Sequence, residues 1–251
     1  MNSPRLDTEL VRLGLARSRS EAQALIRSGA VSVDCNDALK PSSRVPEGAQ
    51  IIVGSDHPRW VSRGALKLLH AIETFDISVG GKRAIDVGAS TGGFTEVLLA
   101  KGASGVVAID VGVDQLAASL RNDPRVVSFD GRNVREISAG EIGPCGQIVV
   151  ADLSFISLTK VVDKIMELGC PEADLILLIK PQFEVGPRSV GRGGLVKDPV
   201  AHASAVEKVI AAYSAVGADV RRVVDSPIEG GDGNKEFLLW CRKGAATEGD
   251  T

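Results

Sequence analysis

The sequence is poor in the features that mark several special classes of protein. Its 251 residues include four cysteines, two tryptophans and one tyrosine, and aromatic residues make up 4%. No apolar run approaches the roughly 18 residues that cross a bilayer. The cysteines form no CxxC pair, which argues against a zinc site and a secreted disulfide framework. We therefore expect no metal and a reducing compartment. The cysteines are Cys35, Cys145, Cys170 and Cys241.

An export signal is also missing from the first residues. The segment 1–5 is followed by no apolar stretch of the kind that a signal peptide carries. The expected location is the cytoplasm. The length fits one domain of about 180 to 200 residues with a small appendage, and a chain of this size can bury a core without disulfides.

A strong charge of one sign is absent as well, because 29 basic residues face 32 acidic ones. The charge is unevenly placed, however. Residues 1–72 contain ten Lys and Arg against seven Asp and Glu, whereas residues 73–251 contain nineteen against twenty-five. We expect a polyanion to meet the amino-terminal part first, and a merely solvated basic face is the alternative.

The first 57 residues show the pattern of a small α+β domain. Leu6, Leu10 and Leu13 form one helical stripe, and Ser18 with Glu21 predicts the capped start of a second helix, followed by short strands at 31–33 and 51–53. The run RLDTELVRLGLARSRSEAQALIRSGAVSVD resembles the RNA-binding module shared by a small-subunit ribosomal protein, many pseudouridine synthases and bacterial tyrosyl-tRNA synthetases. The turn at 35–38 departs from that module, which usually has Asn-Gly or Asp-Gly there. The candidate RNA-binding residues are Arg5, Arg17, Arg19, Arg27 and Arg63.

A linker at 58–62 precedes a longer α/β region. Ser62 is placed to cap a helix that carries Arg63 and Lys67. Strand-like runs then occur at 84–87, 105–109, 148–151, 175–179, 220–224 and 237–241, and a further strand is expected to end at Asp130. Helical segments lie between most of them. This alternation predicts a doubly wound, Rossmann-like α/β domain over 63–243, with a flexible tail at 244–251.

The turn after the first strand of this region predicts a cofactor site. Asp86 is followed by Gly88 and Gly92-Gly93, instead of the G-x-G-x-x-G of dinucleotide folds. A carboxylate there would repel a pyrophosphate but suits a ligand with an amino group, such as S-adenosylmethionine. Asp110 is placed for the ribose diol and Asp130 for the adenine. The candidate cofactor-binding residues are Asp86, Gly88, Ser90, Thr91, Gly92, Phe94, Asp110, Asp130, Asn133 and Asp152.

Four charged residues are expected at the same sheet edge. Asp152 and Lys180 directly follow apolar strands, Lys67 lies on the helix before the first strand, and Glu236 begins the last strand. They converge if that last strand is antiparallel; otherwise each is an ordinary exposed charge. Two lysines and two carboxylates suit methylation of a sugar hydroxyl, and Lys180 is the candidate general base.

At this point nearly the whole chain, about 5–242, resembles one family. The ordered motifs VSRGALKL, DVGASTGGFTEVLL, VADLSFISL, IKPQFEVG and GNKEFLLW are similar to those of the TlyA family of haemolysin-named ribosomal RNA 2′-O-methyltransferases. The resemblance implies an FtsJ/RrmJ-type catalytic domain whose Lys-Asp-Lys-Glu tetrad is Lys67, Asp152, Lys180 and Glu236. It further implies methylation of cytidine ribose on assembled ribosomal subunits, sensitivity to cyclic-peptide ribosome antibiotics, and Phe155 near the cofactor; a core position for Phe155 is the alternative.

Three other functions compete with this interpretation. The segment 152–155 occupies the place of the D/N-P-P-F/Y motif of amine methyltransferases, but it lacks both prolines, and the two lysines would then be idle. A membrane-active haemolysin needs spanning segments that the sequence does not show. A non-catalytic RNA chaperone would bind RNA without transferring a methyl group. The oligomeric state is not predicted, and no membrane partner is expected.

Overall fold

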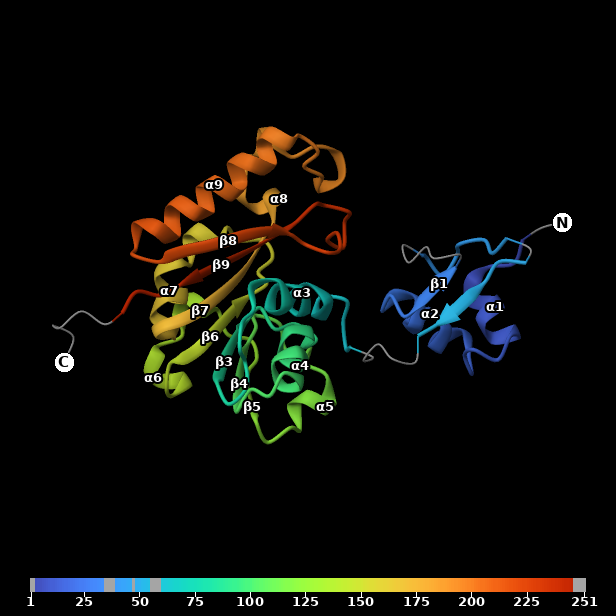
Figure 1. Ribbon diagram of the computed structural model, residues 1–251, viewed down its shortest axis with the longest axis horizontal. Coiled ribbons are helices and arrows are strands. Elements are labelled where there is room, and N and C mark those ends of the chain that lie inside the picture. Colours follow the sequence, from blue (N-terminus) through green and yellow to red (C-terminus); the bar gives the residue numbers. More distant parts are fainter. Residues whose placement is uncertain (1–2, 34–38, 47, 55–59, 246–251) are drawn as a thin grey trace. The chain divides into compact units, whose positions relative to one another are not determined.

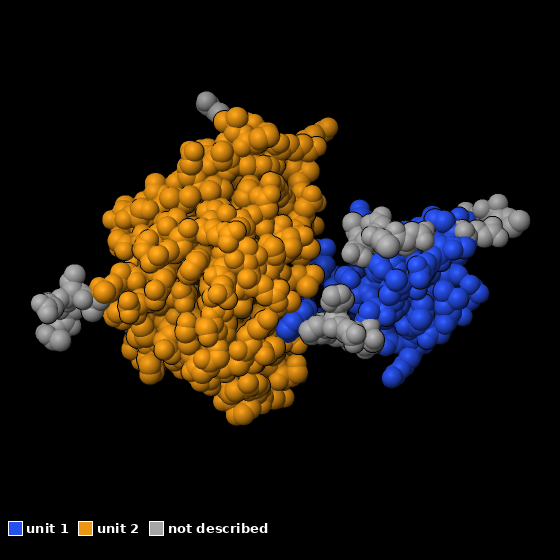
Figure 2. All heavy atoms as spheres, viewed as in Figure 1, with its two compact units in different colours: residues 1–63 blue, residues 64–251 orange. Residues whose placement is uncertain are grey.

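The computed structural model describes residues 3–33, 39–46, 48–54 and 60–245. The chain divides into two compact units, residues 1–63 and residues 64–251 (Figure 2). The predicted turn at 35–38, the first two residues of the predicted linker at 58–62 and most of the predicted tail lie outside the described residues. Each unit is considered by itself below.

The first unit is a small α+β domain. It contains the helices α1 (Leu6–Arg12) and α2 (Arg19–Arg27) and the antiparallel strands β1 (Val31–Val33) and β2 (Ile51–Val53). Leu6 and Leu10 are buried as predicted, but Leu13 is 45% exposed because α1 ends at Arg12. Ser18 accepts a hydrogen bond from the Glu21 N–H and so caps α2, as the sequence predicts.

The second unit is built on a seven-stranded sheet with the order β5-β4-β3-β6-β7-β9-β8 (Figure 1). The first five strands of that order are parallel, and β9 is antiparallel to both of its neighbours. The fold prediction is therefore confirmed, including the antiparallel last strand. The strands are β3 (Arg83–Val87), β4 (Gly105–Ile109), β5 (Val126–Phe129), β6 (Gly146–Ala151), β7 (Gly169–Ile179), β8 (Asp219–Asp225) and β9 (Phe237–Arg242).

Helices cover both faces of this sheet, with α3, α4 and α5 on one side and α7 and α9 on the other (Figure 1). The expected cap at Ser62 is wrong, because α3 begins at Ala65 and has Gly64 at its N-cap position, without a capping side chain. The α-helices are α3 (Ala65–Phe75), α4 (Gly93–Ala100), α5 (Ala118–Arg121), α6 (Ala139–Ile142), α7 (Val162–Leu168), α8 (Pro181–Glu184) and α9 (Pro199–Ala215). Short 3-10 turns are η1 (Val134–Glu136), η2 (Leu158–Lys160), η3 (Pro187–Ser189) and η4 (Arg192–Gly194).

The strand order reverses between β3 and β6, which lie side by side in the middle of the sheet. Open α/β sheets bind ligands outside the carboxyl ends of the strands at such a reversal. These strands contribute to a buried apolar cluster, in which Ile85, Val87, Val149 and Ala151 are at most 1% exposed. The carboxyl edge of β3 and β6 is therefore a rigid platform for a site.

The cysteine spacing indicates no secreted disulfide framework, yet one disulfide is formed among the described residues. Cys145 and Cys170 are joined, with their Cα atoms 5.0 Å apart. They lie close because Gly146 of β6 is the register partner of Gly169 of β7, so the two cysteines are next to a paired position of neighbouring strands. Sequence spacing alone does not reveal this pairing. Cys241 is free and buried.

Candidate active site

The turn after β3 has a conformation that requires glycine at two positions. Gly88 has φ +86°, and a Cβ there would lie 2.4 Å from the carbonyl oxygen of Asp152. Gly92 has φ +99°, and its Cβ would lie 2.2 Å from the Leu120 side chain. Any other residue would be strained and would collide with its neighbours. The glycines thus bring the backbone of this turn close to the end of β6 and to α5.

Asp86 is fully buried at the carboxyl end of β3. Its Oδ2 accepts a hydrogen bond from the Thr95 hydroxyl at 2.7 Å, whereas Oδ1 has no hydrogen-bond partner among the described residues. The pKa of Asp86 is raised to about 7, mainly by burial and to a smaller extent by the negative charges of Asp152 and Asp110. A buried acceptor without a donor is costly. The ammonium group of a bound methionine moiety fits this acceptor in charge and hydrogen-bonding character.

Asp110 organises the loop at the end of β4. Its Oδ2 accepts from the Ser90 N–H at 2.8 Å and its Oδ1 accepts from the Gly112 N–H at 2.6 Å. The carboxylate therefore joins two loops of the cofactor side and keeps lone pairs for a diol. Val111 and Val113, beside it, are 70% and 68% exposed. Exposed valines flanking such a carboxylate form an apolar surface that the sequence analysis missed, although the alternation in DVGVD was a signal for it.

The other predicted cofactor residues occupy different environments. Asp130 accepts from Arg121 at 3.0 Å and from the Asp114 N–H at 3.3 Å. Asn133 accepts from the Arg135 N–H and begins η1. Phe94 is buried in the first turn of α4, whereas Thr91 is exposed. These contacts show how the loops are held, and cofactor contact by these four residues stays a prediction.

The four charged residues of the predicted tetrad come together as two ion pairs. Lys67 Nζ lies 2.5 Å from Glu236 Oε2, and both side chains are buried. Lys180 Nζ lies 2.6 Å from Asp152 Oδ1 and donates to the Ser154 hydroxyl at 2.9 Å. The pairs meet at one edge because Ile179 of β7 is the register partner of Phe237 of β9, so the next residues, 180 and 236, adjoin. Ser154 is a partner that the sequence analysis did not name.

Phe155 is not a core residue. Its side chain is 91% exposed, its backbone has φ +64°, and its ring packs against Phe183 with centroids 5.4 Å apart. A phenylalanine with a left-handed backbone is uncommon, and such strain is found mainly at functional sites. The alternative of a buried Phe155 is therefore excluded, and an exposed aromatic ring stands beside the Lys180–Asp152 pair.

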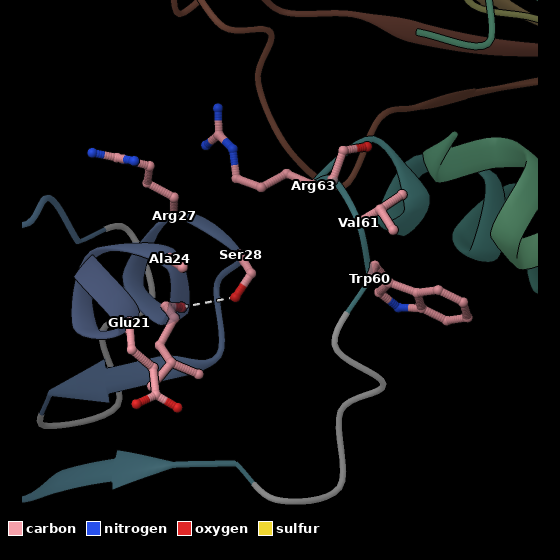
Figure 3. A pocket seen from close by; sticks show the side chains of 9 residues that line it. Glu21, Ala24, Arg27, Ser28, Trp60, Val61 and Arg63 are labelled. Atoms are coloured by element: carbon pink, nitrogen blue, oxygen red, sulfur yellow. Dashed lines mark hydrogen bonds between the residues drawn. The ribbon is translucent and has the colours of Figure 1, made fainter. Parts of the chain in front are cut away.

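The predicted RNA-binding arginines differ in whether their guanidinium groups bind a carboxylate of the same unit. Arg5 and Arg19 both donate to the buried Asp7, and the hydrogen bond from Arg5 chiefly holds the pKa of that carboxyl well below its usual range. Arg17 and Arg27 are exposed. Arg27 and the exposed Arg63 line a hollow in the first unit, and the side chain of Arg63 extends toward the side of Arg27 (Figure 3).

Comparisons with known proteins agree with this geometry. Residues 60–243 match the family model of FtsJ-like methyltransferases, and residues 4–51 match that of the S4 domain. The chain is 50% identical to the 16S/23S rRNA (cytidine-2′-O)-methyltransferase TlyA of Mycobacterium tuberculosis, over 95% of this chain and 89% of that protein. The chain belongs to the TlyA family of ribosomal RNA 2′-O-methyltransferases. S-adenosylmethionine is accordingly its methyl donor.

Relatives named for haemolysis are also similar to this chain. Hemolysin A of Brachyspira hyodysenteriae is 38% identical over 93% of this chain and 98% of that protein. A solved structure of a hemolysin-named protein from Streptococcus thermophilus is 35% identical and has a TM-score of 0.75, covering 100% of this chain and 92% of that one. Within the described residues, no helix of this TlyA-family chain has the length and apolar character needed to cross a membrane.

Proposed function

We propose that this chain methylates the ribose 2′-hydroxyl of a cytidine in ribosomal RNA, on assembled subunits in the cytoplasm, with Lys180 as general base. The observation that carries this proposal is the arrangement of two lysine–carboxylate pairs at the edge formed by the carboxyl ends of β6 and β7 and the beginning of β9. An aromatic amine needs no lysine to accept its proton, whereas a ribose hydroxyl is a poor nucleophile until its proton has an acceptor.

The turn after β3 would hold the cofactor, which supplies an electrophilic methyl group when bound. Asp86 offers its unpartnered Oδ1 to the amino group, and Gly88 allows close approach of the backbone. Asp110 accepts from the ribose hydroxyls, and Val111 and Val113 offer an apolar surface to the adenine. Asp130 and Asn133 border the same region. Ser90, Thr91, Gly92 and Phe94 shape the turn that carries these contacts.

Lys180 is the residue that can take up the hydroxyl proton. To accept the proton it must be in its neutral form, with one lone pair on Nζ. The contact of Nζ with Asp152 Oδ1 at 2.6 Å and its hydrogen bond to the Ser154 hydroxyl at 2.9 Å would direct that lone pair at the substrate. Lys67, paired with the buried Glu236, keeps a positive charge near the oxygen as negative charge develops on it. Fixed groups of this kind reduce the reorganisation needed in the transition state.

The RNA substrate would be bound at two places. The exposed ring of Phe155 gives the target base a face to stack on once it leaves the RNA stack, since base–aromatic stacking contributes about 1–3 kcal/mol. Arg17, Arg27 and Arg63 have exposed guanidinium groups for phosphates, and Arg5 and Arg19 complete the set through the N–H groups that Asp7 leaves free. We expect no membrane partner.

Alkaline hydrolysis of ribosomal RNA tests the proposal directly. A methylated 2′-oxygen cannot attack its own phosphate, so treated RNA should gain a site that resists cleavage. The same RNA with a 2′-deoxynucleotide at that site should accept no methyl group. Lys180→Ala enzyme is the matched control and should leave the site cleavable. A methyl group found on the base, or on the deoxy substrate, would refute the assignment.

A further inference from the structure

Glu184 is a buried carboxylate that the mechanism above does not use. It is the last residue of α8, four residues after Lys180, and is 3% exposed. Its Oε1 accepts a hydrogen bond from the Leu158 N–H at 2.7 Å, and its Oε2 accepts one from the Ser157 hydroxyl. Both donors belong to the segment that follows β6. Among the described residues, no ion pair to Glu184 is formed.

Glu184 makes one of three sets of contacts between the segment 152–158 and the segment 180–184. The segment 152–158 carries Asp152, Ser154 and Phe155, and the segment 180–184 carries Lys180. Lys180 contacts Asp152 and Ser154, the Phe183 ring packs on the Phe155 ring, and Glu184 binds residues 157 and 158. The first contact is the proposed reacting pair, and the second is largely exposed. Only the third is fully buried.

Glu184 and Ser157 are also held by residues that lie outside both segments. Lys208 of α9 donates to the backbone carbonyl of Glu184 at 2.7 Å, and the Ser157 hydroxyl lies 2.7 Å from the Thr159 hydroxyl. Buried and fully satisfied hydrogen bonds of this kind fix geometry, because any movement leaves a donor or acceptor without a partner. The strained φ of +64° at Phe155 also needs support from its surroundings.

We infer that Glu184 is a positioning residue for methyl transfer: it fixes the segment 154–158 against the Lys180 turn, and so sets the Lys180–Asp152–Ser154 geometry and the place of the Phe155 ring. This inference rests on the proposed function. Cofactor binding should not depend on it, because the Asp152 N–H is tied separately to the Val87 carbonyl at 3.0 Å.

Two substitutions separate hydrogen bonding from charge. In Glu184→Gln, the amide oxygen can accept from the Leu158 N–H while the amide nitrogen donates to Ser157, which keeps its bond to Thr159. In Glu184→Leu, both acceptors are lost at nearly the same volume. We expect Glu184→Leu to lower kcat roughly 10- to 100-fold, as for a reacting group displaced by about 1 Å, with the KM for S-adenosylmethionine within about threefold of wild type. Glu184→Gln should restore kcat to within about threefold.

Asp174→Leu is the matched control. Asp174 is also a buried carboxylate with two side-chain donors, Lys82 and Trp240, each at 3.1 Å, but it lies in the middle of β7, away from the carboxyl end that precedes Lys180. Its loss should lower the melting temperature and leave kcat unchanged well below that temperature. Hydrogen exchange at the Leu158 amide gives a readout without activity: protection should fall in Glu184→Leu and persist in Glu184→Gln.

The outcomes decide between positioning and simple stability. The inference is overturned if folded Glu184→Leu keeps full kcat, if Glu184→Gln is as impaired as Glu184→Leu, or if Asp174→Leu loses kcat equally. Should Glu184→Leu fail to fold, Ser157→Ala removes one donor alone, and an unchanged kcat in that variant also overturns it. Absence of any methyl transfer by wild-type enzyme would instead refute the proposed function. The hydrogen-exchange experiment would still test whether Glu184 fixes the segment 154–158.

Discussion

The buried carboxyl of Asp86 should make both cofactor affinity and stability depend on pH. Its pKa is raised to about 7 in the folded protein against 3.8 for an ordinary aspartate, mainly by burial. The folded state therefore prefers the protonated form. A group with a raised folded pKa contributes stability that is complete below about pH 4 and is lost as the pH rises through about 7. A difference of about 3 pKa units corresponds to about 4 kcal/mol.

The same carboxyl should couple cofactor binding to proton release. The ammonium group of S-adenosylmethionine favours ionised Asp86, so binding below pH 7 must expel the proton, and affinity should rise up to tenfold for each pH unit between about 5 and 7. Above about pH 8 the ligand's own amino group loses its charge, since α-amino groups titrate at about 7.7–8.0. Affinity should therefore be greatest between these values.

Calorimetry in buffers of different ionisation enthalpy measures the released proton directly. Asp86→Asn keeps the shape and the Thr95 contact but removes the ionisable group. At pH 7.5 we expect it to bind roughly 10- to 100-fold more weakly, the loss of a charge-assisted hydrogen bond, with no proton release. The folded variant without ligand should be more stable than wild type at pH 8. Wild-type affinity that does not change between pH 5.5 and 7.5, or unchanged affinity in Asp86→Asn, would refute this reasoning.

Three further predictions concern the other parts of the site. Lys180→Ala should abolish methyl transfer while leaving cofactor binding, measured by calorimetry, intact, because the amine acts chiefly in the transition state. Full activity in this variant would refute the role of Lys180 as the base. Asp110→Ala should weaken cofactor binding by about 1–3 kcal/mol, and unchanged affinity in a folded variant would remove the ribose assignment. Arg17→Ala should reduce the slope of log affinity for RNA against log salt by about 0.7 in filter binding, as expected for one phosphate contact on a single strand. Arg5→Ala, which breaks the ion pair with Asp7, should in addition lower the melting temperature. If all variants have the same salt slope as wild type, these arginines contact solvent and not phosphate.

Most of the fold could be predicted because hydrophobic runs and their spacing determine it locally. Residues 175–179 at the end of β7, for example, are an unbroken apolar run, as expected for a strand buried on both faces. Boundaries set by single polar contacts were less predictable. Ser62 has the character of a cap, yet α3 begins only after Gly64. The Cys145–Cys170 disulfide depends on the register of β6 and β7, which composition does not encode.

The site was predictable to the extent that sheet topology carries residues to one edge. Lys180 and Glu236 adjoin because β9 is antiparallel to β7, and this required only one topological assumption. The contacts within the edge were not predictable. Nothing in the spacing says that Lys180 pairs with Asp152 rather than Glu236, or that Glu184 reaches back to Leu158. Such contacts depend on loop geometry, which forms only when the chain is packed.

The division of the tetrad into two pairs also explains why one lysine rather than the other is the proposed base. Glu236 is enclosed by Lys67 and by the Gly230 backbone, where an added Cβ would lie 2.5 Å from Glu236 Oε1. We therefore expect this closely packed pair to act through its fixed charge. Lys180 instead donates to the exposed Ser154, next to the ring of Phe155. In the proposed function, a nucleotide stacked on that ring would place its ribose near Lys180, while the Lys67–Glu236 pair joins α3 to the residue that precedes β9.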